Sequence, residues 1–569
     1  MHQNKSVRLL VSILLFVFFS GIDVSAQEGF ESPLGFMVIN KAVVEIENKS
    51  DPELRILSVG KITFDRMCVK QYSLSTLTSL EVVGGSWQTR FTEAGAFRAD
   101  ASFWQEINPA HKLESLILKN CQLGPEVDWE NISRELPRLK NVQFAFSPNT
   151  EAWDGLGNLK TFPELETLGL DTHDFSQWKF QFLSSLPHLK KLMIGGYFGR
   201  HRVTQSCPRL MQALEIQAGL KVLELHKFTL DELALKSLSA MPDLKELRLF
   251  GCALDVSNLK YLARIQNLKQ LTISNCSMRG ELSLLKDDSD FFQGFSQLES
   301  LKVVARSGLP LNRFKNLQKL DSLYLIDGAL SAEELNRIEC SRLETLDLSH
   351  LGFVVTDEKL APLFKRNRIG SLRFFLCDLD GPEIEKISAR PELRRLELDS
   401  LHSIDNQAVS FSPQSQITHL ELGGMSEPPG LEEIARLKKL KSLKLHGDHY
   451  PLQKLMLLDK LETFQTLVLD GCQLNIQDFR SISKLRRLKR LSLPHCKISS
   501  NDLHELGKLD HLKLLDLRNT HIKSSSSQDT LATFVNLSKR LPSNCTISLS
   551  LDLSQQAEEN ALLKKMNSE

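Results

Sequence analysis

The sequence FQTLVLDGCQL at residues 464–474 is followed by two further copies of its pattern, each 24 residues after the last. The second copy is LKRLSLPHCKI at residues 488–498 and the third is LKLLDLRNTHI at residues 512–522. Counting the first residue of each copy as offset 0, apolar residues recur at offsets 3, 5 and 10, and Cys or Thr occupies offset 8. A phrase that recurs at one fixed period within a chain is the sequence signature of a repeat architecture.

The same phrase starts at 19 positions, and eight of the 18 intervals between them are 24 residues long. Leucine alone accounts for 102 of the 569 residues, which indicates one kind of core repeated many times. The starts are Leu54, Leu77, Leu113, Leu139, Leu165, Leu189, Leu220, Leu244, Leu268, Leu298, Leu320, Leu343, Ile369, Leu393, Ile417, Leu440, Phe464, Leu488 and Leu512.

Each period predicts a strand followed by a short helix. Apolar residues at offsets 3 and 5 alternate with variable ones, which is typical of a half-buried strand whose leucines point inward. Apolar residues at offsets 15, 18 and 21, such as Leu259, Leu262 and Ile265, fit one face of a short helix. Ser331 and Glu334 have the spacing of a capping box at the start of such a helix. One unit cannot close its own core, so neighbouring units must stack.

The phrase LxxLxLxxC/NxL resembles the leucine-rich repeat, and the helical return resembles its ribonuclease-inhibitor-like and cysteine-containing subtypes. The resemblance implies an α/β solenoid, curved like a horseshoe, with parallel strands on the concave face and helices on the convex face. It also implies binding of a protein ligand on the concave face, without saying which ligand. We expect the array to run unbroken over residues 54–553.

The regions outside the array have separate predictions. Residues 1–26 have a basic start, an eleven-residue apolar run and a small-residue cleavage pattern ending at Ala26, which predict a secretory signal peptide. Residues 27–53 are expected to form an N-terminal cap, and residues 554–569 a C-terminal tail. Ile547 and Leu549 begin an alternating pattern that suits a last strand. Three long intervals contain residues 88–108, 199–209 and 279–290, which we expect to loop out of the stack, either as tolerated insertions or as binding loops.

Charge and motifs exclude several classes of function. The chain has 70 Lys and Arg against 70 Asp and Glu, which argues against nucleic-acid binding. Beyond the leader no stretch is apolar enough to span a membrane. No nucleophile elbow, phosphate-binding loop or HExxH motif is present, so we predict no enzyme activity and no cofactor.

Cysteine, histidine and basic clusters have structural explanations. Six cysteines lie at offset 8, where they are expected to be buried, reduced and bonded to the backbone: Cys121, Cys252, Cys276, Cys377, Cys472 and Cys496. One disulfide among the remaining four, Cys68, Cys207, Cys340 and Cys545, is left open. His446, Asp448 and His449 have metal-ligand chemistry, but the spacing has no second copy and we predict no metal. The basic runs at residues 436–441 and 484–490 fit helix C-termini, where cations complement the helix dipole.

The outward strand positions, offsets 4 and 6, give the candidate site. Successive residues at one offset should form columns across the sheet, and Asp347, Arg373 and Glu397 should pair side by side. Large apolar residues in these columns have no role in the fold, and exposed apolar patches often mark interfaces. We therefore centre the ligand on the repeats from Leu220 to Leu393. The predicted contact residues are Arg248, Phe250, Lys302, Tyr324, Ile326, Asp347, Arg373, Phe375, Glu397, Asp399, Glu421 and Lys444.

Together these features predict an exported, monomeric interaction module that binds a protein ligand through its concave face. The alternative is an adhesive protein of the cell envelope that recognises a polysaccharide or other surface polymer. A sugar-binding face should carry repeated aromatic residues, whereas the columns carry mixed charges with a few large residues, which favours a protein ligand.

Overall fold

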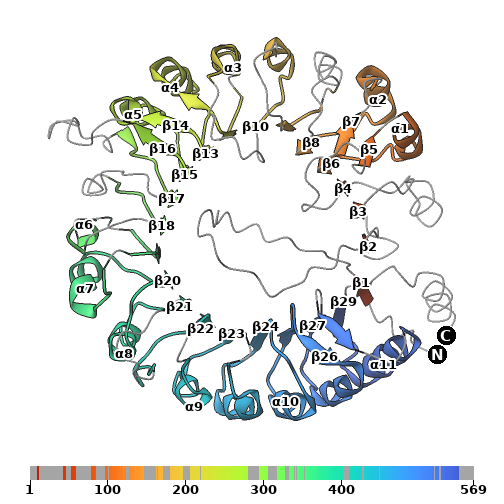
Figure 1. The fold of residues 1–569 in the computed structure, drawn as a ribbon, viewed down its shortest axis with the longest axis vertical. Coiled ribbons are helices and arrows are strands. Elements are labelled where there is room, and N and C mark those ends of the chain that lie inside the picture. The colour runs from red at the N-terminus through yellow and green to blue at the C-terminus, as the bar shows by residue number, and fades with distance from the viewer. Residues whose placement is uncertain are drawn as a thin grey trace, which may run out of the picture.

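The computed structural model describes most of residues 97–549 and four short strands that precede them. The longer gaps in this description are residues 146–161, 171–179, 196–205, 280–293, 305–316, 327–331 and 402–408. Figure 1 shows strands lining an inner circle and helices arranged around the outside. The fold is a leucine-rich repeat solenoid, as predicted.

The described main sheet has 22 strands. Consecutive strands of this sheet from β3 to β29 pair in parallel, and the described helices lie in the returns between them. These strands are β3 (Glu53–Ser58), β4 (Ser79–Gly84), β6 (Ser115–Lys119), β8 (Asn141–Ala145), β9 (Thr167–Leu170), β10 (Lys191–Gly195), β11 (Val222–His226), β13 (Glu246–Phe250), β15 (Gln270–Ser274), β17 (Ser300–Val304), β18 (Ser322–Ile326), β19 (Thr345–Ser349), β20 (Ser371–Phe375), β21 (Arg395–Asp399), β22 (His419–Gly423), β23 (Ser442–His446), β24 (Thr466–Asp470), β25 (Arg490–Ser492), β27 (Leu514–Leu517) and β29 (Thr546–Leu549).

The N-terminal end of the sheet has a different pairing. β2 (Val43–Ile46) pairs antiparallel with β3 within the region predicted as a cap. β1 (Leu9–Val11) pairs in parallel with β29 and antiparallel with β2. β1 lies within residues 1–26, the predicted signal peptide. The parallel pairing of the strands from β3 to β29 does not involve β1.

Short helices form the outer layer. Their hydrophobic residues are buried against the strand leucines, as Leu235 and Leu238 of α4 and Leu503 and Leu506 of η10 show. The described helices are α1 (Ala101–Ile107), α2 (Trp129–Glu135), η4 (Phe180–Ser185), α3 (Pro208–Glu215), α4 (Glu232–Ser239), η5 (Val256–Asn258), α5 (Leu259–Leu262), α6 (Ala332–Asn336), α7 (Asp357–Arg366), α8 (Gly381–Ser388), α9 (Leu431–Ile434), η9 (Leu452–Lys460), α10 (Ile476–Ile482), η10 (Ser500–Lys508) and α11 (Ser527–Arg540). The helix predicted after Ser331 is α6, and Ser331 itself lies outside the described residues.

A left-handed backbone residue at offset 7 ends many of the strands. Gly251 has φ 59° and Gly471 has φ 70°, a conformation that costs glycine little. Lys227, Asn275 and His495 adopt the same conformation at the same offset. The chain therefore turns away from the strand at one fixed point of the repeat, which brings offset 8 back under the sheet.

Small secondary sheets follow these turns. They consist of β12 (Thr229–Leu230), β14 (Ala253–Asp255) and β16 (Ser277–Arg279), of β26 (Lys497–Ser499) with β28 (His521–Lys523), and of β5 (Phe97–Ala99) with β7 (Cys121–Leu123).

The cysteine prediction holds for the five offset-8 residues whose burial is described. Each of these thiols is free and buried, and each donates to the backbone of the preceding repeat, as Cys496 Sγ does to the Leu469 carbonyl at 3.1 Å. Cys207, Cys340 and Cys545 are also buried, and none of these three forms a disulfide. Cys68 and the side chain of Cys121 lie outside the described residues.

Two details of the predicted array are wrong. Leu54 pairs with Leu80, which stands at offset 3, so the first repeat begins three residues before the predicted start. The stretch 88–108 does not loop out as a whole, because residues 97–107 form β5 and α1, and Phe103 and Ile107 are buried in the core. The spacing of apolar residues within one repeat could not predict either feature, because both depend on which strands pair with each other. Residues 199–205 and 280–290 of the other two stretches lie outside the described residues.

Candidate functional site on the concave face

The strand register confirms the predicted columns. At offset 4, Cα pairings link nine consecutive strands from β13 to β23 in the order Arg248, Thr272, Lys302, Tyr324, Asp347, Arg373, Glu397, Glu421 and Lys444. At offset 6, Phe250, Ile326, Phe375 and Asp399 lie on the same face. The structure therefore brings all twelve predicted residues onto one surface.

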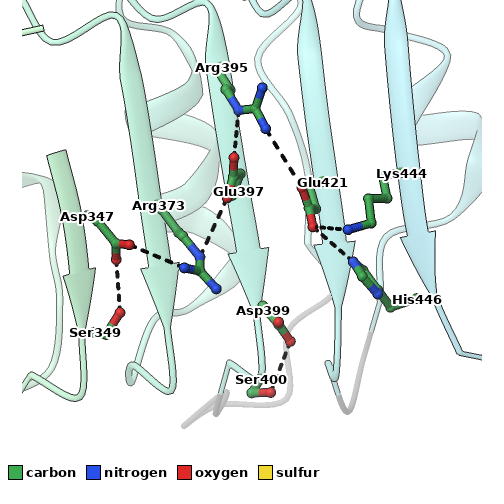
Figure 2. Close-up of polar contacts among 10 residues, drawn as sticks. All are labelled: Asp347, Ser349, Arg373, Arg395, Glu397, Asp399, Ser400, Glu421, Lys444 and His446. Atoms are coloured by element: carbon green, nitrogen blue, oxygen red, sulfur yellow. Dashed lines mark hydrogen bonds and ion pairs between the residues drawn. The ribbon is translucent and has the colours of Figure 1, made fainter. Parts of the chain in front are cut away.

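Ion pairs link much of the C-terminal part of this surface (Figure 2). Arg373 lies between Asp347 and Glu397, with Nη1 3.2 Å from Asp347 Oδ2 and Nε 3.5 Å from Glu397 Oε2. Arg395 donates from Nε to Glu397 Oε1 at 2.5 Å and reaches Glu421 Oε2 at 3.9 Å. We call this set, extended by Lys444, His446 and Asp470, the C-terminal ladder.

The far end of the C-terminal ladder is built around His446. Its Nε2 is 2.9 Å from Glu421 Oε1, its Nδ1 is 3.4 Å from Asp470 Oδ2, and Lys444 Nζ lies 2.8 Å from Glu421 Oε1. Burial by itself would lower the pKa of His446, but the bonds to Asp470 and Glu421 outweigh it and raise that pKa to about 9. Burial would raise the pKa of Glu421, but His446 and Lys444 lower it to about 2. The imidazole is therefore a cation that interacts with a carboxylate through each of its two nitrogens.

A second, smaller ladder lies at the N-terminal side. Glu224 is buried, with 3% of its surface exposed, and its Oε1 is 2.7 Å from His226 Nε2. Arg248 Nη1 lies 3.2 Å from Glu224 Oε2, and Arg248 Nε donates to Glu246 Oε1 at 2.6 Å. Burial lowers the pKa of His226 despite the bond to Glu224. We call these four residues the N-terminal ladder.

The predicted apolar residues lie on the concave face but are half-buried rather than exposed. Phe250 stacks on the His226 ring, with centroids 4.6 Å apart and an angle of 12° between the planes. The Arg373 guanidinium lies 5.4 Å from the Phe375 ring centroid. Tyr324 and Ile326 are also half-buried. These side chains face solvent only in part, because neighbouring columns are one strand spacing apart and long side chains cover each other.

Two predicted residues carry charges that no described residue pairs with. Lys302 is exposed on β17, between Thr272 and Tyr324, and takes part in no described ion pair. Asp399 on β21 accepts a hydrogen bond from the Ser400 hydroxyl at 3.0 Å and likewise has no cation within ion-pair distance among the described residues. In Figure 2 its carboxylate lies apart from the Arg373–Glu397 pair of the ladder.

Sequence reasoning missed the third column, at offset 2. Arg395 occupies it and connects Glu397 with Glu421 of the offset-4 column, and Glu246 occupies it and contacts Arg248. The period-2 pattern contained the signal, because offset 2 shares the parity of offsets 4 and 6. Glu224 was overlooked as well, although it stands at offset 4 one repeat before Arg248.

Other candidate features are accounted for away from this face. The basic runs follow α9 and α10 on exposed turns, as predicted, except that Arg490 begins β25 on the concave face. Arg486 N donates to Asp459 Oδ1 at 2.9 Å. Within the described residues no cluster of three or more His, Cys, Asp or Glu could hold a metal ion. No helix in the same part of the chain is long and apolar enough to cross a membrane.

Comparisons with known proteins extend no further than the fold. No family model matches the chain, and no curated protein matches its sequence. Among solved structures, the TLR13–ssRNA13 complex is 18% identical with a TM-score of 0.41, over 86% of this chain and 73% of that one. The leucine-rich repeat ectodomain of the Arabidopsis receptor kinase HAESA, in complex with an extended IDA peptide hormone, is 17% identical with a TM-score of 0.33, over 80% and 76%. An internalin of Listeria monocytogenes is 13% identical with a TM-score of 0.30, over 85% and 89%.

Proposed function

We propose that this protein is an exported, monomeric interaction module, of the ribonuclease-inhibitor-like or cysteine-containing subtype, that binds a protein or peptide ligand on its concave face. It acts without catalysis or a cofactor and does not bind nucleic acid. The observation that carries the proposal is the surface between the two ladders. There β17 and β18 present Lys302, Tyr324 and Ile326, and β20, at the edge of the C-terminal ladder, adds Phe375. The packing of the solenoid core uses none of these side chains.

The ladders support this placement of the ligand. Each of their carboxylates lies within ion-pair distance of a cation of the same sheet, so a ligand would have to break existing ion pairs there. Aromatic side chains that are part apolar and part accessible are typical binding hot spots. The face between the ladders also lacks the repeated aromatic column that a polysaccharide platform would need, which favours a peptide chain as the ligand.

Export is part of the proposal and has a direct test. Processing after Ala26 would leave Gln27 as the first residue of the mature protein. Mass spectrometry of the N-terminal peptide, in a host that secretes the full chain, should identify Gln27. Retention of residues 1–26 on protein recovered from the cell interior would contradict export.

The concave-face assignment is tested by displayed peptides and paired variants. A random peptide library is selected on the wild-type protein, and the binders are measured on the double variant Tyr324→Ala/Phe375→Ala and on the control Met456→Ala. Met456 is 42% exposed on η9, on the convex side. The double variant should weaken binding by about 2 kcal/mol, roughly thirtyfold, with a small change in melting temperature. Binders that respond to Met456→Ala and ignore the double variant would overturn the assignment.

A further inference from the structure

Among the predicted contact residues, Lys302 and Asp399 are the two charged ones without a described ion pair, and they lie on opposite sides of the apolar residues of the site. Lys302 is on β17 and Asp399 on β21, with β18, β19 and β20 between them. Four strand spacings and a shift of two residues along the strand separate their Cα atoms by about 20 Å. Their charges are opposite, so a ligand that contacts both must present a negative group at one end and a positive group at the other.

The residues between these charges form a diagonal path. Tyr324 and Ile326 follow Lys302 on β18, Ser349 follows on β19, and Phe375 lies next to Asp399. Ser349 and Asp347 have short, buried side chains flanked by the larger Tyr324, Ile326, Arg373 and Phe375. The Ser349 hydroxyl donates a hydrogen bond to Asp347 Oδ1 at 2.9 Å, so these two polar side chains already have a hydrogen-bond partner. A ligand that crosses the path therefore contacts apolar side chains of β18 and β20, with the small polar side chains of β19 between them.

From this arrangement we infer that the ligand segment is an extended peptide with an acidic residue and a basic residue about six positions apart and apolar residues between them. An extended chain advances about 3.3 Å per residue, so six residues span about 20 Å. The acidic side chain lies over Lys302, the basic side chain lies over Asp399, and the inner residues pack on Tyr324, Ile326 and Phe375. This inference rests on the proposed function and specifies its ligand.

The other cations among the predicted contact residues already have carboxylate partners, as does Arg395 beside them. Arg373, Arg395 and Lys444 each contact a carboxylate of the C-terminal ladder, and Arg248 contacts two in the N-terminal ladder. Charge complementarity across an interface mainly sets specificity and register. Two unpaired charges at a fixed separation therefore select for both the sign and the spacing of the ligand charges.

The test uses blocked heptapeptides with one common interior of alternating leucine and threonine. The first and seventh residues are glutamate and lysine, two glutamates, or two lysines, and a fourth peptide places glutamate and lysine only two positions apart. Binding is measured by calorimetry on the wild type and on Lys302→Glu, Asp399→Lys, the double exchange, and the control Lys438→Glu, an exposed cation in the turn after α9.

The wild type should bind the widely spaced mixed peptide about tenfold more tightly than the other three. Lys302→Glu should instead prefer the peptide with two lysines, Asp399→Lys the peptide with two glutamates, and the double exchange should restore the preference for the mixed one. Lys438→Glu should behave as wild type. Asp399→Asn, a milder change, should remove the preference at that end without reversing it.

The possible failures are distinguishable. If no peptide binds the wild type, or if all four bind equally to every variant, the inference about charge and spacing is wrong. If the inference about charge and spacing fails but the library binders still depend on Tyr324 and Phe375, the proposed binding on the concave face is supported and only the charge pattern of the ligand is wrong. If those binders are also indifferent to Tyr324 and Phe375, the proposed function fails independently.

Discussion

His446 shows at the scale of one residue how the concave face is held together. Its imidazole joins β23 to Glu421 of β22 on one side and to Asp470 of β24 on the other. Asp470 also accepts from His495 Nδ1 at 2.8 Å, so the network continues into the next repeat. A single titratable ring thus links three consecutive strands.

The charge of His446 should make stability depend on pH. The pKa is about 9 in the folded state and near 6.5 in an unfolded chain, so the folded state binds this proton more tightly. The stabilisation is complete below about pH 6.5 and disappears as the pH rises through about 9. Allowing for solvent screening of this partly exposed group, we expect a loss of about 1 kcal/mol over that window.

Thermal melts of wild type and His446→Gln from pH 6 to pH 10 measure this effect. The wild type should lose stability relative to the variant as the pH rises, whereas His188→Gln, at an exposed position outside the ladders, should follow the wild type. Parallel curves for wild type and His446→Gln would contradict the ion-pair role.

The offset-8 cysteines should be unreactive thiols in the folded protein. Burial raises the pKa of Cys252 and Cys377 and removes access for reagents. Alkylation followed by mass spectrometry should label them only after denaturant is added. Rapid labelling of native Cys252 or Cys472, or recovery of a Cys472–Cys496 disulfide, would show that the offset-8 position is not the closed environment described.

At the scale of the element, α10 has the most complete start of the described helices. Asn475 Oδ1 accepts from the backbone N–H groups of Gln477 and Asp478, and Asp478 Oδ2 accepts from the Asn475 N–H at 2.9 Å. This reciprocal capping box satisfies donors that a helix N-terminus otherwise leaves unpaired.

Removing the cap should destabilise the repeat that contains α10. Asn475→Ala is expected to cost about 1 kcal/mol of unfolding free energy, because the first turn loses its side-chain acceptor. Denaturant unfolding measures the change, and Gln477→Ala, an exposed neighbour that contributes only its backbone, serves as the control. Equal destabilisation by the two variants would mean that the cap contributes nothing specific.

At the scale of the whole molecule, the stacked repeats determine the shape. Strand spacing of about 4.8 Å over 19 coils gives an inner arc of about 90 Å, and Figure 1 shows how strongly that arc curves. Small-angle scattering from the chain that begins at Gln27 should therefore show a hollow, strongly curved particle. A distance distribution typical of a compact sphere of this mass would contradict the solenoid.

The repeat, the strands and the columns could all be predicted from the sequence. Strand side chains alternate with a period of two, and the repeat sets which residues stand side by side. Asp347, Arg373 and Glu397 are therefore predicted to share one column, and the strand register confirms it. These features follow from local spacing, and a regular spacing repeated in every unit leaves one consistent stacking.

Only the tertiary structure decided which neighbours in a column bond to each other. Arg395 reaches two glutamates from offset 2, and Phe250 stacks on His226 where an exposed ring was expected. The pairing of Leu54 with Leu80 and the folding of residues 97–107 into the stack were likewise fixed by partner strands. The physical reason is that a side chain's rotamer, its burial and its ionic partner depend on atoms brought together from different repeats, and no period within one repeat encodes that choice.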